Sequence, residues 1–389
     1  MSKKIQSINP YNNELLKEFD YFTDDELEQK IIKANDAFLV WKKTSYEEKV
    51  KLFKNLYEIM MSKKEELAKL NTFEMWMLYS DALWDITKSS SNILFFANNA
   101  KDYLASKEIN EHWVKAKIVY EPMWIIFSIM PWNYPFNQVL RSVIPNLIAW
   151  NVVLLKHASN VPQVAVKLEE LFKEAWFPEW VYTNLFITHD KTEKIISDFR
   201  IKWTNVTGSD IVWREVWKLS WMYIKPSIIE LGWNDAFIVW NVKNIDAVVS
   251  KAVKARFSNN WQKCNSSKRF IVLNSVYDEF LAKFKTQVEA LKVWDPMVAT
   301  TNIWPLAKKS AVDTIEKQVS ETISAWAELI TGWERIDWVG AFYKPTILAW
   351  VKSWMKTFKE ETFGPVASVI KASYIYDAVK LANDSVYGL

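Results

Sequence analysis

Short apolar runs alternate with amphipathic stretches from Lys115 onwards, and this alternation restricts the fold more than any other feature of the sequence. Ile118–Tyr120, Trp124–Met130 and Val152–Leu155 have the length and the β-branched or aromatic content of strands. Helix-like spacing of apolar residues follows at 161–174. Strand, helix and strand in this order predict a parallel sheet with crossover helices. We therefore expect an α/β fold.

The same pattern divides the chain into two parts. The N-terminal region is helical in pattern and begins with the capping-box sequence Thr23-Asp24-Asp25-Glu26. After about Leu231 a second alternation starts, with helix-like segments at 245–258 and 277–291 around a strand-like run at 270–273. No low-complexity linker or internal repeat separates the two parts. The change of pattern predicts two α/β domains with a boundary near Leu231.

Charge, apolar runs and cysteine content exclude several classes of protein. A net charge of +3, from 49 basic and 46 acidic residues, is not the footprint of a nucleic-acid-binding protein. The first residues lack the apolar core of a signal peptide, and no uncharged apolar run reaches transmembrane length, so we expect a cytoplasmic protein without a membrane partner. Cys264 is the sole cysteine, and the only histidines are His112, His157 and His189. We expect neither a disulfide framework nor a metal site.

Glycine and tryptophan occur in abnormal numbers, 6 and 23. Together they make 29 of 389 residues, which is an ordinary share for glycine alone, about 7%. Several tryptophans stand in turn contexts where glycine would supply positive φ, such as Phe177-Pro178-Glu179-Trp180 and Thr331-Gly332-Trp333-Glu334. We hypothesise that most of these codons are UGA, read as glycine in the source organism and translated here as tryptophan. The alternative is a genuinely Trp-rich protein with aromatic binding surfaces, although the tryptophans form no periodic stripe.

Two residues are candidates for covalent or acid–base chemistry. Cys264 follows a helix-like segment among small polar residues, where the N–H groups of a following helix can stabilise a thiolate. A lone cysteine is more often a small buried hydrophobe, so both interpretations stand at this point. Glu230 ends an apolar run, and a carboxylate at the carboxyl end of a parallel strand lies where ligand crevices form in α/β sheets. An ion pair or a helix cap is the alternative for Glu230.

Two loops carry groups suited to anions. Val206-Thr207-Gly208-Ser209 leads from a strand into a helix, and the helix N–H groups with the Ser209 hydroxyl suit a phosphate, although this signal alone is weak. In the turn Met130–Pro135, Asn133 offers an amide that can donate to a developing oxyanion, although most asparagines in turns bond to their own backbone. We interpret His157 as a polar residue at a strand end rather than a catalytic one.

Five segments in order match one family. They are Pro131-Trp132-Asn133, Val206-Thr207-Gly208-Ser209, Glu230-Leu231-Gly232-Trp233, Trp261-Gln262-Lys263-Cys264 and Glu360-Glu361-Thr362-Phe363-Gly364-Pro365-Val366. With the suspect tryptophans read as glycine, the chain resembles the NAD(P)-dependent aldehyde dehydrogenase superfamily from about Ile8 to its last residue. Cys264 follows Glu230 by 34 residues, as it does in that family. The family has tryptophan at Trp132, and it has glycine at Trp124, Trp150, Trp213, Trp233, Trp261, Trp294 and Trp304.

The resemblance implies a mechanism. In that family a cysteine thiolate attacks the aldehyde carbon, and Cys264 matches this nucleophile. Asn133 matches the side chain that, with a backbone N–H, holds the oxyanion of the thiohemiacetal. Hydride then passes to the nicotinamide, and water that a glutamate deprotonates hydrolyses the thioester, a role that Glu230 matches. The implied reaction is oxidation of an aldehyde to the carboxylate.

The resemblance also implies the cofactor, NAD or NADP. Lys156 matches the lysine that binds the adenosine ribose hydroxyls. Ser159 stands where NAD-preferring members often have a glutamate, so NADP is also admissible. The remaining implied contacts are Gly208 and Ser209 for the pyrophosphate, and Trp132, Glu361 and Phe363 for the nicotinamide end.

Within the superfamily the chain is most similar to succinate-semialdehyde dehydrogenases, through Trp132–Arg141 and Leu155–Ala158. Arg141 occupies a position where those enzymes carry an arginine, and a substrate carboxylate requires such a cation. The alternative for Arg141 is a plain surface or ion-pair residue. Some of them have a second arginine six residues before the cysteine, where this chain has Ser258. Two alternatives remain, an acylating semialdehyde reductase, which would not need Glu230, and an inactive Trp-rich relative or binding protein.

The resemblance further predicts the domains. We expect a Rossmann-type cofactor domain at 1–105 and 123–231, a small oligomerisation segment at 106–122, and a catalytic domain at 232–389. Family members continue beyond the position of Leu389, so we expect the catalytic domain and the partner strand of the oligomerisation segment to be incomplete here. A homodimer or homotetramer is expected for the full-length chain.

Overall fold

The computed structural model describes residues 4–111, 113–258, 262–303, 305–336 and 340–388. The chain forms two compact units, which we describe separately. Unit 1 comprises Met1–Ser7, Leu15–Glu74 and Ala82–Leu231. Unit 2 comprises Ile8–Glu14, Met75–Asp81 and Gly232–Leu389.

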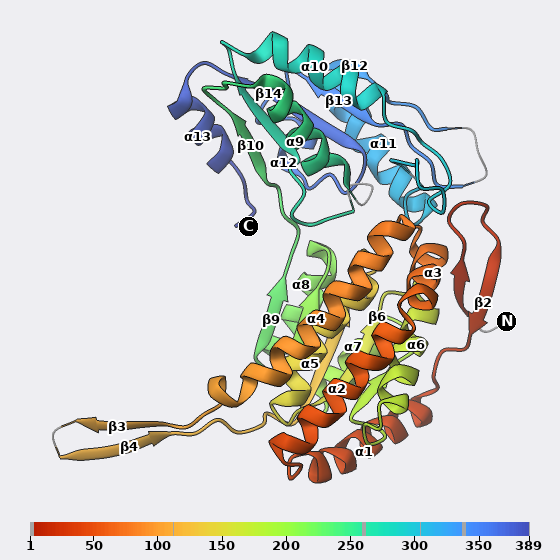
Figure 1. The fold of residues 1–389 in the computed structure, drawn as a ribbon, viewed down its shortest axis with the longest axis vertical. Coiled ribbons are helices and arrows are strands. Elements are labelled where there is room, and N and C mark those ends of the chain that lie inside the picture. Colours follow the sequence, from red (N-terminus) through yellow and green to blue (C-terminus); the bar gives the residue numbers. More distant parts are fainter. Residues whose placement is uncertain (1–3, 112, 259–261, 304, 337–339, 389) are drawn as a thin grey trace. The chain divides into compact units, whose positions relative to one another are not determined.

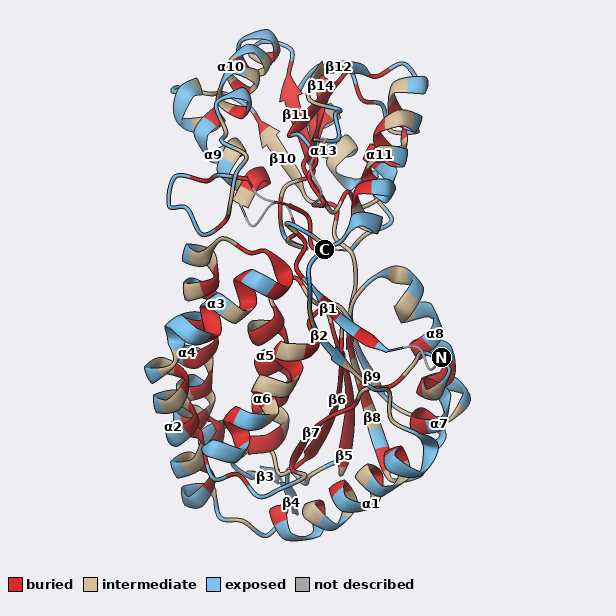
Figure 2. Cartoon of the chain, turned by 90° about the vertical axis from the view of Figure 1, so that its right-hand side faces the viewer, coloured by how far each residue is buried: buried red, intermediate tan, exposed pale blue. Residues whose placement is uncertain are grey.

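Unit 1 is built around a five-stranded parallel sheet with the order β7-β6-β5-β8-β9. All residues of β5 and β6 are buried, because helices cover both faces of the sheet. Figure 2 shows α5 and α6 on one face and α1, α7 and α8 on the other. The bounds are β5 Ile125–Met130, α5 Pro135–Ile148, β6 Val152–His157, α6 Pro162–Glu174, β7 Tyr182–Asn184, α7 Lys191–Ser197, β8 Ile201–Thr207, α8 Asp210–Met222 and β9 Ser227–Glu230.

The chain order reverses between β5 and β8. The segments after β5 and β6 cross towards β7, whereas the segment after β8 crosses towards β9. Such a switch point opens a crevice at the carboxyl ends of the two central strands, which is where α/β sheets bind ligands.

N-terminal helices pack beside this sheet. The predicted capping box at α1 forms, because the Thr23 hydroxyl accepts from the Glu26 N–H and the Glu26 carboxylate accepts from the Thr23 N–H. Ser45 and Glu48 form a second capping box at α2. The remaining N-terminal elements are β1 Ile5–Ile8, β2 Leu15–Phe19, α1 Asp24–Trp41, α2 Tyr46–Ser62, α3 Lys64–Met75 and α4 Tyr79–Tyr103.

A two-stranded hairpin, β3 Lys107–Glu111 and β4 Val114–Ile118, leaves the helices of unit 1 (Figure 1). Every residue of both strands is exposed. The predicted strand at Ile118–Tyr120 is therefore displaced, because the strand ends at Ile118.

Unit 2 is a second five-stranded sheet with the order β10-β11-β14-β13-β12. Its strands are parallel except β12, which pairs antiparallel with β13 at one edge. Two apolar clusters cover the two faces of the sheet, one with α9 and α10 and the other with α11, α12 and α13. The bounds are β10 Ala236–Val239, α9 Ile245–Phe257, β11 Arg269–Leu273, α10 Tyr277–Glu289, α11 Lys309–Ser324, β12 Glu328–Thr331, β13 Thr346–Ala349, α12 Lys356–Lys359, β14 Val366–Ala372 and α13 Ile375–Asn383.

Candidate active site

Predicted site residues gather at the carboxyl edge of the unit 1 sheet. Trp132 and Asn133 follow β5, Lys156 lies near the end of β6, and Ser159 follows it. Gly208 and Ser209 follow β8, and Glu230 is the last residue of β9. The four strands are neighbours and parallel, so their carboxyl ends meet at one edge. The residues thus lie around the switch point.

Two of the helices that start at this edge are capped by buried carboxylates of the protein itself. Glu74 accepts from the backbone N–H groups of Gln163 and Val164 at the start of α6, both at 2.8 Å. Asp85 accepts from the backbone N–H groups at the start of α5. Burial raises the pKa of Glu74 to about 7 and that of Asp85 to about 8. The N-termini of α5 and α6 therefore already hold acidic groups.

The start of α8 differs. Ser209 is its N-cap residue, and in the described structure its hydroxyl makes no capping bond to the helix. The Gly208 N–H donates to the Glu230 carbonyl oxygen at 3.2 Å, which joins the turn after β8 to the end of β9. The first-turn N–H groups of α8 and the Ser209 hydroxyl thus offer donors to a phosphate.

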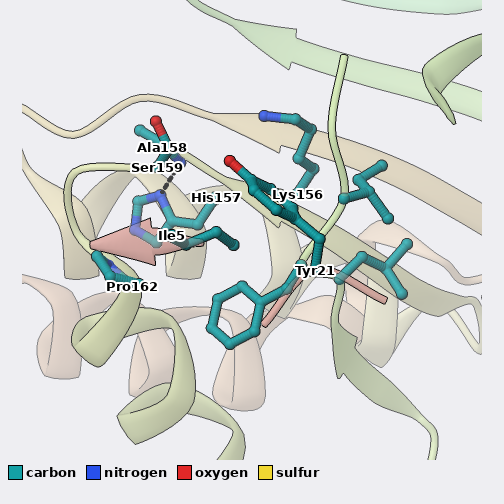
Figure 3. A pocket seen from close by; sticks show the side chains of 10 residues that line it. Ile5, Tyr21, Lys156, His157, Ala158, Ser159 and Pro162 are labelled. Carbon is teal, nitrogen blue, oxygen red and sulfur yellow. Dashed lines mark hydrogen bonds between the residues drawn. The ribbon is translucent and has the colours of Figure 1, made fainter. Parts of the chain in front are cut away.

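A small pocket lies at the end of β6 (Figure 3). Lys156, His157, Ala158, Ser159 and Pro162 line one part of it, and the side chains of the other part come from Ile5, Tyr21, Leu185, Phe186 and Ile187. None of these lining residues is acidic. Burial lowers the pKa of the Lys156 ammonium, and the charge on Lys156 in turn lowers the pKa of His189. The pocket is therefore suited to an anionic group.

His157 holds the loop that carries Asn133. Its Nε2 lies 3.2 Å from the Pro135 carbonyl oxygen, and its Nδ1 accepts from the Ala158 N–H at 2.9 Å. Burial lowers the pKa of His157 to about 4, so the ring is neutral at pH 7. A neutral ring that donates from Nε2 ties β6 to the start of α5, a structural role.

Arg141 and Glu230 form an ion pair in unit 1. Arg141 Nη2 donates to Glu230 Oε2. Arg141 lies in α5 and Glu230 ends β9, so the pair joins elements 89 residues apart. The two residues thus belong to one cluster, which the sequence alone did not indicate.

In unit 2, Lys268 joins the loop of Cys264 to Glu361. Its ammonium donates to the Cys264 carbonyl oxygen and lies 3.1 Å from Glu361 Oε1. The Glu361 carboxylate also accepts from the Trp233 N–H at 3.2 Å. Cys264 precedes β11 and Glu361 precedes β14, and these strands are parallel neighbours, so both loops lie at the amino edge of this sheet. Sequence reasoning missed Lys268, whose only signal was a lysine four residues after the cysteine.

Arg256 fixes the segment that carries Phe363. This guanidinium is buried and donates to the carbonyl oxygens of Thr362, Gly364 and Val366. It also donates to the Ser266 hydroxyl at 3.0 Å, which links this segment to the cysteine loop. Sequence reasoning missed Arg256 as well, because an arginine in an amphipathic helix is normally on the surface.

Gly232, which follows Glu230-Leu231, lies against the Glu361 side chain. A Cβ atom at this position would lie 2.6 Å from Glu361 Oε2. A side chain here would move the Glu361 carboxylate, so glycine preserves the contacts of Glu361 with Lys268 and with the Trp233 N–H.

The predicted site residues therefore form two groups, each within its own unit. Asn133, Arg141, Lys156, Ser209 and Glu230 belong to unit 1. Unit 2 holds Cys264, Glu361 and Phe363. Within the described residues, no group of three or more His, Cys, Asp or Glu side chains is arranged to hold a metal ion.

Comparison with known proteins identifies the family. The model of the aldehyde dehydrogenase family matches residues 1–389. The chain belongs to the aldehyde dehydrogenase family. A curated relative, succinate-semialdehyde dehydrogenase [NADP(+)] 1 of Mycobacterium tuberculosis (strain ATCC 25618 / H37Rv), is 36% identical over 388 residues, which are 99% of this chain and 85% of the relative. A relative from Deinococcus radiodurans, succinate-semialdehyde dehydrogenase [NADP(+)], is 34% identical over 387 residues, covering 100% of this chain and 81% of the relative.

Solved structures show the same fold. The succinic semialdehyde dehydrogenase of Streptococcus pyogenes in complex with NADP+ superposes with a TM-score of 0.96 at 32% identity, covering 99% of this chain and 85% of that chain. The predictions of an α/β aldehyde dehydrogenase fold and of similarity to succinate-semialdehyde dehydrogenases are confirmed. None of the described helices combines the length and the apolarity that crossing a bilayer requires.

Proposed function

We propose that this aldehyde dehydrogenase oxidises an aldehyde with NADP or NAD, with Cys264 as the nucleophile, Asn133 as an oxyanion donor and Glu230 as the general base. The observation that carries the proposal is the gathering of the predicted unit 1 residues, Asn133 and Glu230 among them, at four neighbouring strand ends around the switch point of that sheet. Unit 1 is the cofactor-binding domain in this proposal, and unit 2, which holds Cys264, is the catalytic domain.

The chemistry explains the residue types. The Cys264 thiolate attacks the aldehyde carbon, and the Asn133 amide donates to the resulting oxyanion. As the C=O bond forms again, hydride leaves the carbon and a thioester remains on Cys264. When bound, the nicotinamide cofactor supplies the hydride acceptor. Glu230 then takes a proton from water, the water oxygen attacks the thioester carbon, and Cys264 leaves as a thiolate.

NADP is the cofactor that the pocket at Lys156 favours. Its lining residues include Lys156 and Ser159 and no carboxylate, so nothing there repels a 2′-phosphate. Lys156 would bind the ribose end, and the donors at Gly208 and Ser209 would bind the pyrophosphate. The relatives from Mycobacterium tuberculosis and Deinococcus radiodurans are named as NADP(+) enzymes, which supports the same choice.

A semialdehyde with a carboxylate, such as succinate semialdehyde, is the proposed substrate. Arg141 supplies a cation for the substrate carboxylate, and the activity named for the relatives agrees. At Ser258, where some succinate-semialdehyde dehydrogenases have an arginine, the Lys263 ammonium donates to the Ser258 hydroxyl at 3.1 Å. A lysine thus supplies positive charge beside this position.

The first test of the function uses Cys264→Ala and Glu230→Gln. Cys264→Ala removes the nucleophile, so no reduced cofactor should form from any aldehyde. Glu230→Gln should keep a pre-steady-state burst of reduced cofactor and slow the following turnover about 10²- to 10⁴-fold, because only thioester hydrolysis needs the base. Stopped-flow absorbance of the reduced nicotinamide measures both phases. A Glu230→Gln enzyme with normal cofactor affinity and no burst would contradict this division of roles.

We also propose that the β3–β4 hairpin is the segment through which copies of this chain associate. In its register, Ile109 faces Ala116, Lys107 faces Ile118, and Glu111 faces Val114. Ile109, Val114, Ala116 and Ile118 therefore share one face, which we call the apolar face, with Lys107 and Glu111 at its two ends. The opposite face carries Glu108, Asn110, Lys115 and Lys117. A solvent-exposed hairpin with four apolar residues on one face is marginally stable alone and favours packing against another chain.

We further propose that most of the tryptophan codons encode glycine in the source organism. Of the eleven described non-glycine residues with positive φ, eight are tryptophans, and the others are Asn13, Ile224 and Asn241. Those eight are Trp76, Trp124, Trp150, Trp176, Trp180, Trp326, Trp333 and Trp350. Positive φ costs a residue with a Cβ about 1–2 kcal/mol, and an indole lacks the short polar side chain with which Asn or Asp bonds to its own turn in this conformation.

Three of these tryptophans end helices in the way that glycine does. Trp150, Trp176 and Trp326 follow the C-cap residues of α5, α6 and α11. At each, the tryptophan N–H and the next N–H bond to carbonyls of the last turn in the two-bond Schellman pattern, as in Trp176 to Lys173 and Phe177 to Phe172. The Trp176 and Trp326 side chains are 80% and 91% exposed, so they gain little from burial.

Gene sequence and peptide mass test this proposal. UGA codons at Trp150, Trp176 and Trp326, with UGG at Trp41 and Trp132, are expected. Peptides of the protein purified from its source should then carry glycine at the first three positions. UGG at all five positions, or tryptophan in those three peptides, would overturn the proposal.

A further inference from the structure

The ion pair between Arg141 and Glu230 places two proposed functional groups in contact with each other. Arg141 Nη2 donates to Glu230 Oε2, and the side chains are 47% and 35% exposed, so both can be reached by a ligand. Glu230 is also held through its backbone, because its carbonyl oxygen accepts from the Gly208 N–H. Its side chain is therefore the part that can change partner.

The pair restricts what Glu230 can do. A general base needs a carboxylate oxygen directed at the water that it deprotonates. The contact of Oε2 with the guanidinium fixes the orientation of the whole carboxylate, so that the ion pair and not the water decides where Oε1 points. While the pair persists, Glu230 is held away from the water-activating role proposed for it.

A substrate carboxylate offers Arg141 an alternative partner. The guanidinium fork binds a carboxylate through two parallel N–H groups, which the single contact to Glu230 does not use fully. If a substrate carboxylate replaces Glu230 on Arg141, the guanidinium keeps a charge-assisted hydrogen bond. Both side chains are partly exposed, so breaking the Arg141–Glu230 pair costs little free energy.

We propose that Arg141 restrains Glu230 in the free enzyme and that the carboxylate of a bound acyl group displaces Glu230, which releases the base for thioester hydrolysis. This inference rests on the proposed function, with Arg141 as the substrate ligand and Glu230 as the base. Arg141 then favours carboxylate-bearing substrates in two steps. It binds the substrate carboxylate, and it releases Glu230 for hydrolysis only when that carboxylate is bound.

The experiment measures thioester hydrolysis directly. p-Nitrophenyl hydrogen succinate and p-nitrophenyl butyrate deliver four-carbon acyl groups to Cys264, one with a terminal carboxylate and one without. Intact-protein mass follows the loss of each acyl group. In the wild-type enzyme the succinyl group should be lost about tenfold faster than the butyryl group, or more, because only the succinyl group releases Glu230.

Arg141→Met separates restraint from binding. The butyryl group should now be lost about tenfold faster than in the wild type, so that the two acyl groups differ little. In steady-state assays the KM for succinate semialdehyde should rise about 10- to 100-fold. Arg141→Lys keeps one cation and should give intermediate rates. Arg335→Met, which removes an equally exposed arginine from an ion pair with Glu316 and Asp313, should change neither rate.

The outcomes distinguish the possible failures. An unchanged butyryl rate in Arg141→Met would overturn the restraint, and a higher KM for succinate semialdehyde would then leave Arg141 as a substrate ligand alone. Equal losses of both rates in Arg141→Met and Arg141→Lys would overturn it in favour of a structural role. Absence of any acyl group on Cys264 in the wild-type enzyme would count against the proposed function itself.

Discussion

At the scale of single residues, tryptophan side chains occur at positive φ, a backbone conformation that favours glycine. Replacing such a tryptophan with glycine should therefore stabilise the protein. Trp176→Gly and Trp326→Gly should each raise the free energy of unfolding, by about 1 kcal/mol. The relief of about 1–2 kcal/mol at positive φ outweighs the extra entropy of glycine in the unfolded chain, about 0.5–1 kcal/mol. Urea unfolding followed by far-UV circular dichroism measures the change.

Trp41→Gly is the matched control. Trp41 is buried in α1, and its Nε1–H donates to the Leu147 carbonyl oxygen at 3.0 Å. The same substitution here opens a cavity and should cost about 3–5 kcal/mol. Destabilisation at Trp176 or Trp326 as well would show that those tryptophans contribute to the fold, contrary to the glycine proposal.

His157 predicts a pH dependence of stability. Its pKa is about 4 in the folded chain, against an ordinary value of 6.5, because burial disfavours the charged ring. Between these values the unfolded chain binds the proton and the folded chain does not, so stability falls as pH falls from about 6.5 to about 4. The loss attributable to His157 amounts to about 3 kcal/mol.

The comparison with His157→Asn isolates this contribution. Glu74 and Asp85 have raised pKa values, and their contributions to the pH dependence have the opposite sign, but they cancel in the difference between the two proteins. Urea unfolding at pH 7 and at pH 4.5 should show the wild type losing more stability than the variant. Equal losses in both proteins would mean that His157 takes up a proton while folded.

Site residues that lie within a recognisable sequence motif were predictable from the sequence. Residues that hold distant loops together through side-chain hydrogen bonds were not. Cys264, Glu230 and Asn133 stand in short segments whose order and spacing match a family. Lys268 and Arg256 became visible only as side chains that join loops distant in the chain. A buried cation leaves no local pattern, because its partners are mostly backbone carbonyls.

At the scale of elements, the β3–β4 hairpin makes association testable. Ile109→Lys with Ile118→Lys places charge on the apolar face and should convert an oligomer into monomers, because burying an unpaired charge at an interface is costly. Glu108→Lys with Asn110→Lys adds the same side chains to the polar face and should leave the oligomer intact. Sedimentation velocity gives the mass of each. A monomeric wild type, or an oligomer unaffected by the first pair, would contradict the proposed role.

Element positions followed from local patterns, with shifts where tertiary pairing decided. The predicted capping box at Thr23 forms at the start of α1. The helices predicted at 161–174, 245–258 and 277–291 lie within a few residues of α6, α9 and α10. The strand predicted at Ile118–Tyr120 ends at Ile118, because it pairs with β3 in a hairpin rather than joining the central sheet. The antiparallel edge strand β12 had no signal in the sequence, since direction depends on the path of the chain.

At the scale of the whole molecule, the proposed site residues are divided between two sheets, at the carboxyl edge of one and at the amino edge of the other. Unit 1 uses the carboxyl edge, where the switch point places Asn133, Lys156 and Ser209. Unit 2 uses the amino edge, where Cys264 and Glu361 precede neighbouring strands. The division explains why the motifs are spread along the chain.

The sequence alone determined the α/β class, the family, the nucleophile and base candidates, and the cofactor type, because these depend on local periodicity and on short segments with ordered spacing. Only the tertiary structure decided that tryptophans hold positive φ, that carboxylates of the protein cap α5 and α6, that Lys268 bridges Cys264 and Glu361, and that Arg141 holds Glu230. Each of these depends on strand order, backbone conformation or contacts between residues far apart in the chain. Such contacts arise from packing, which no local window of sequence contains.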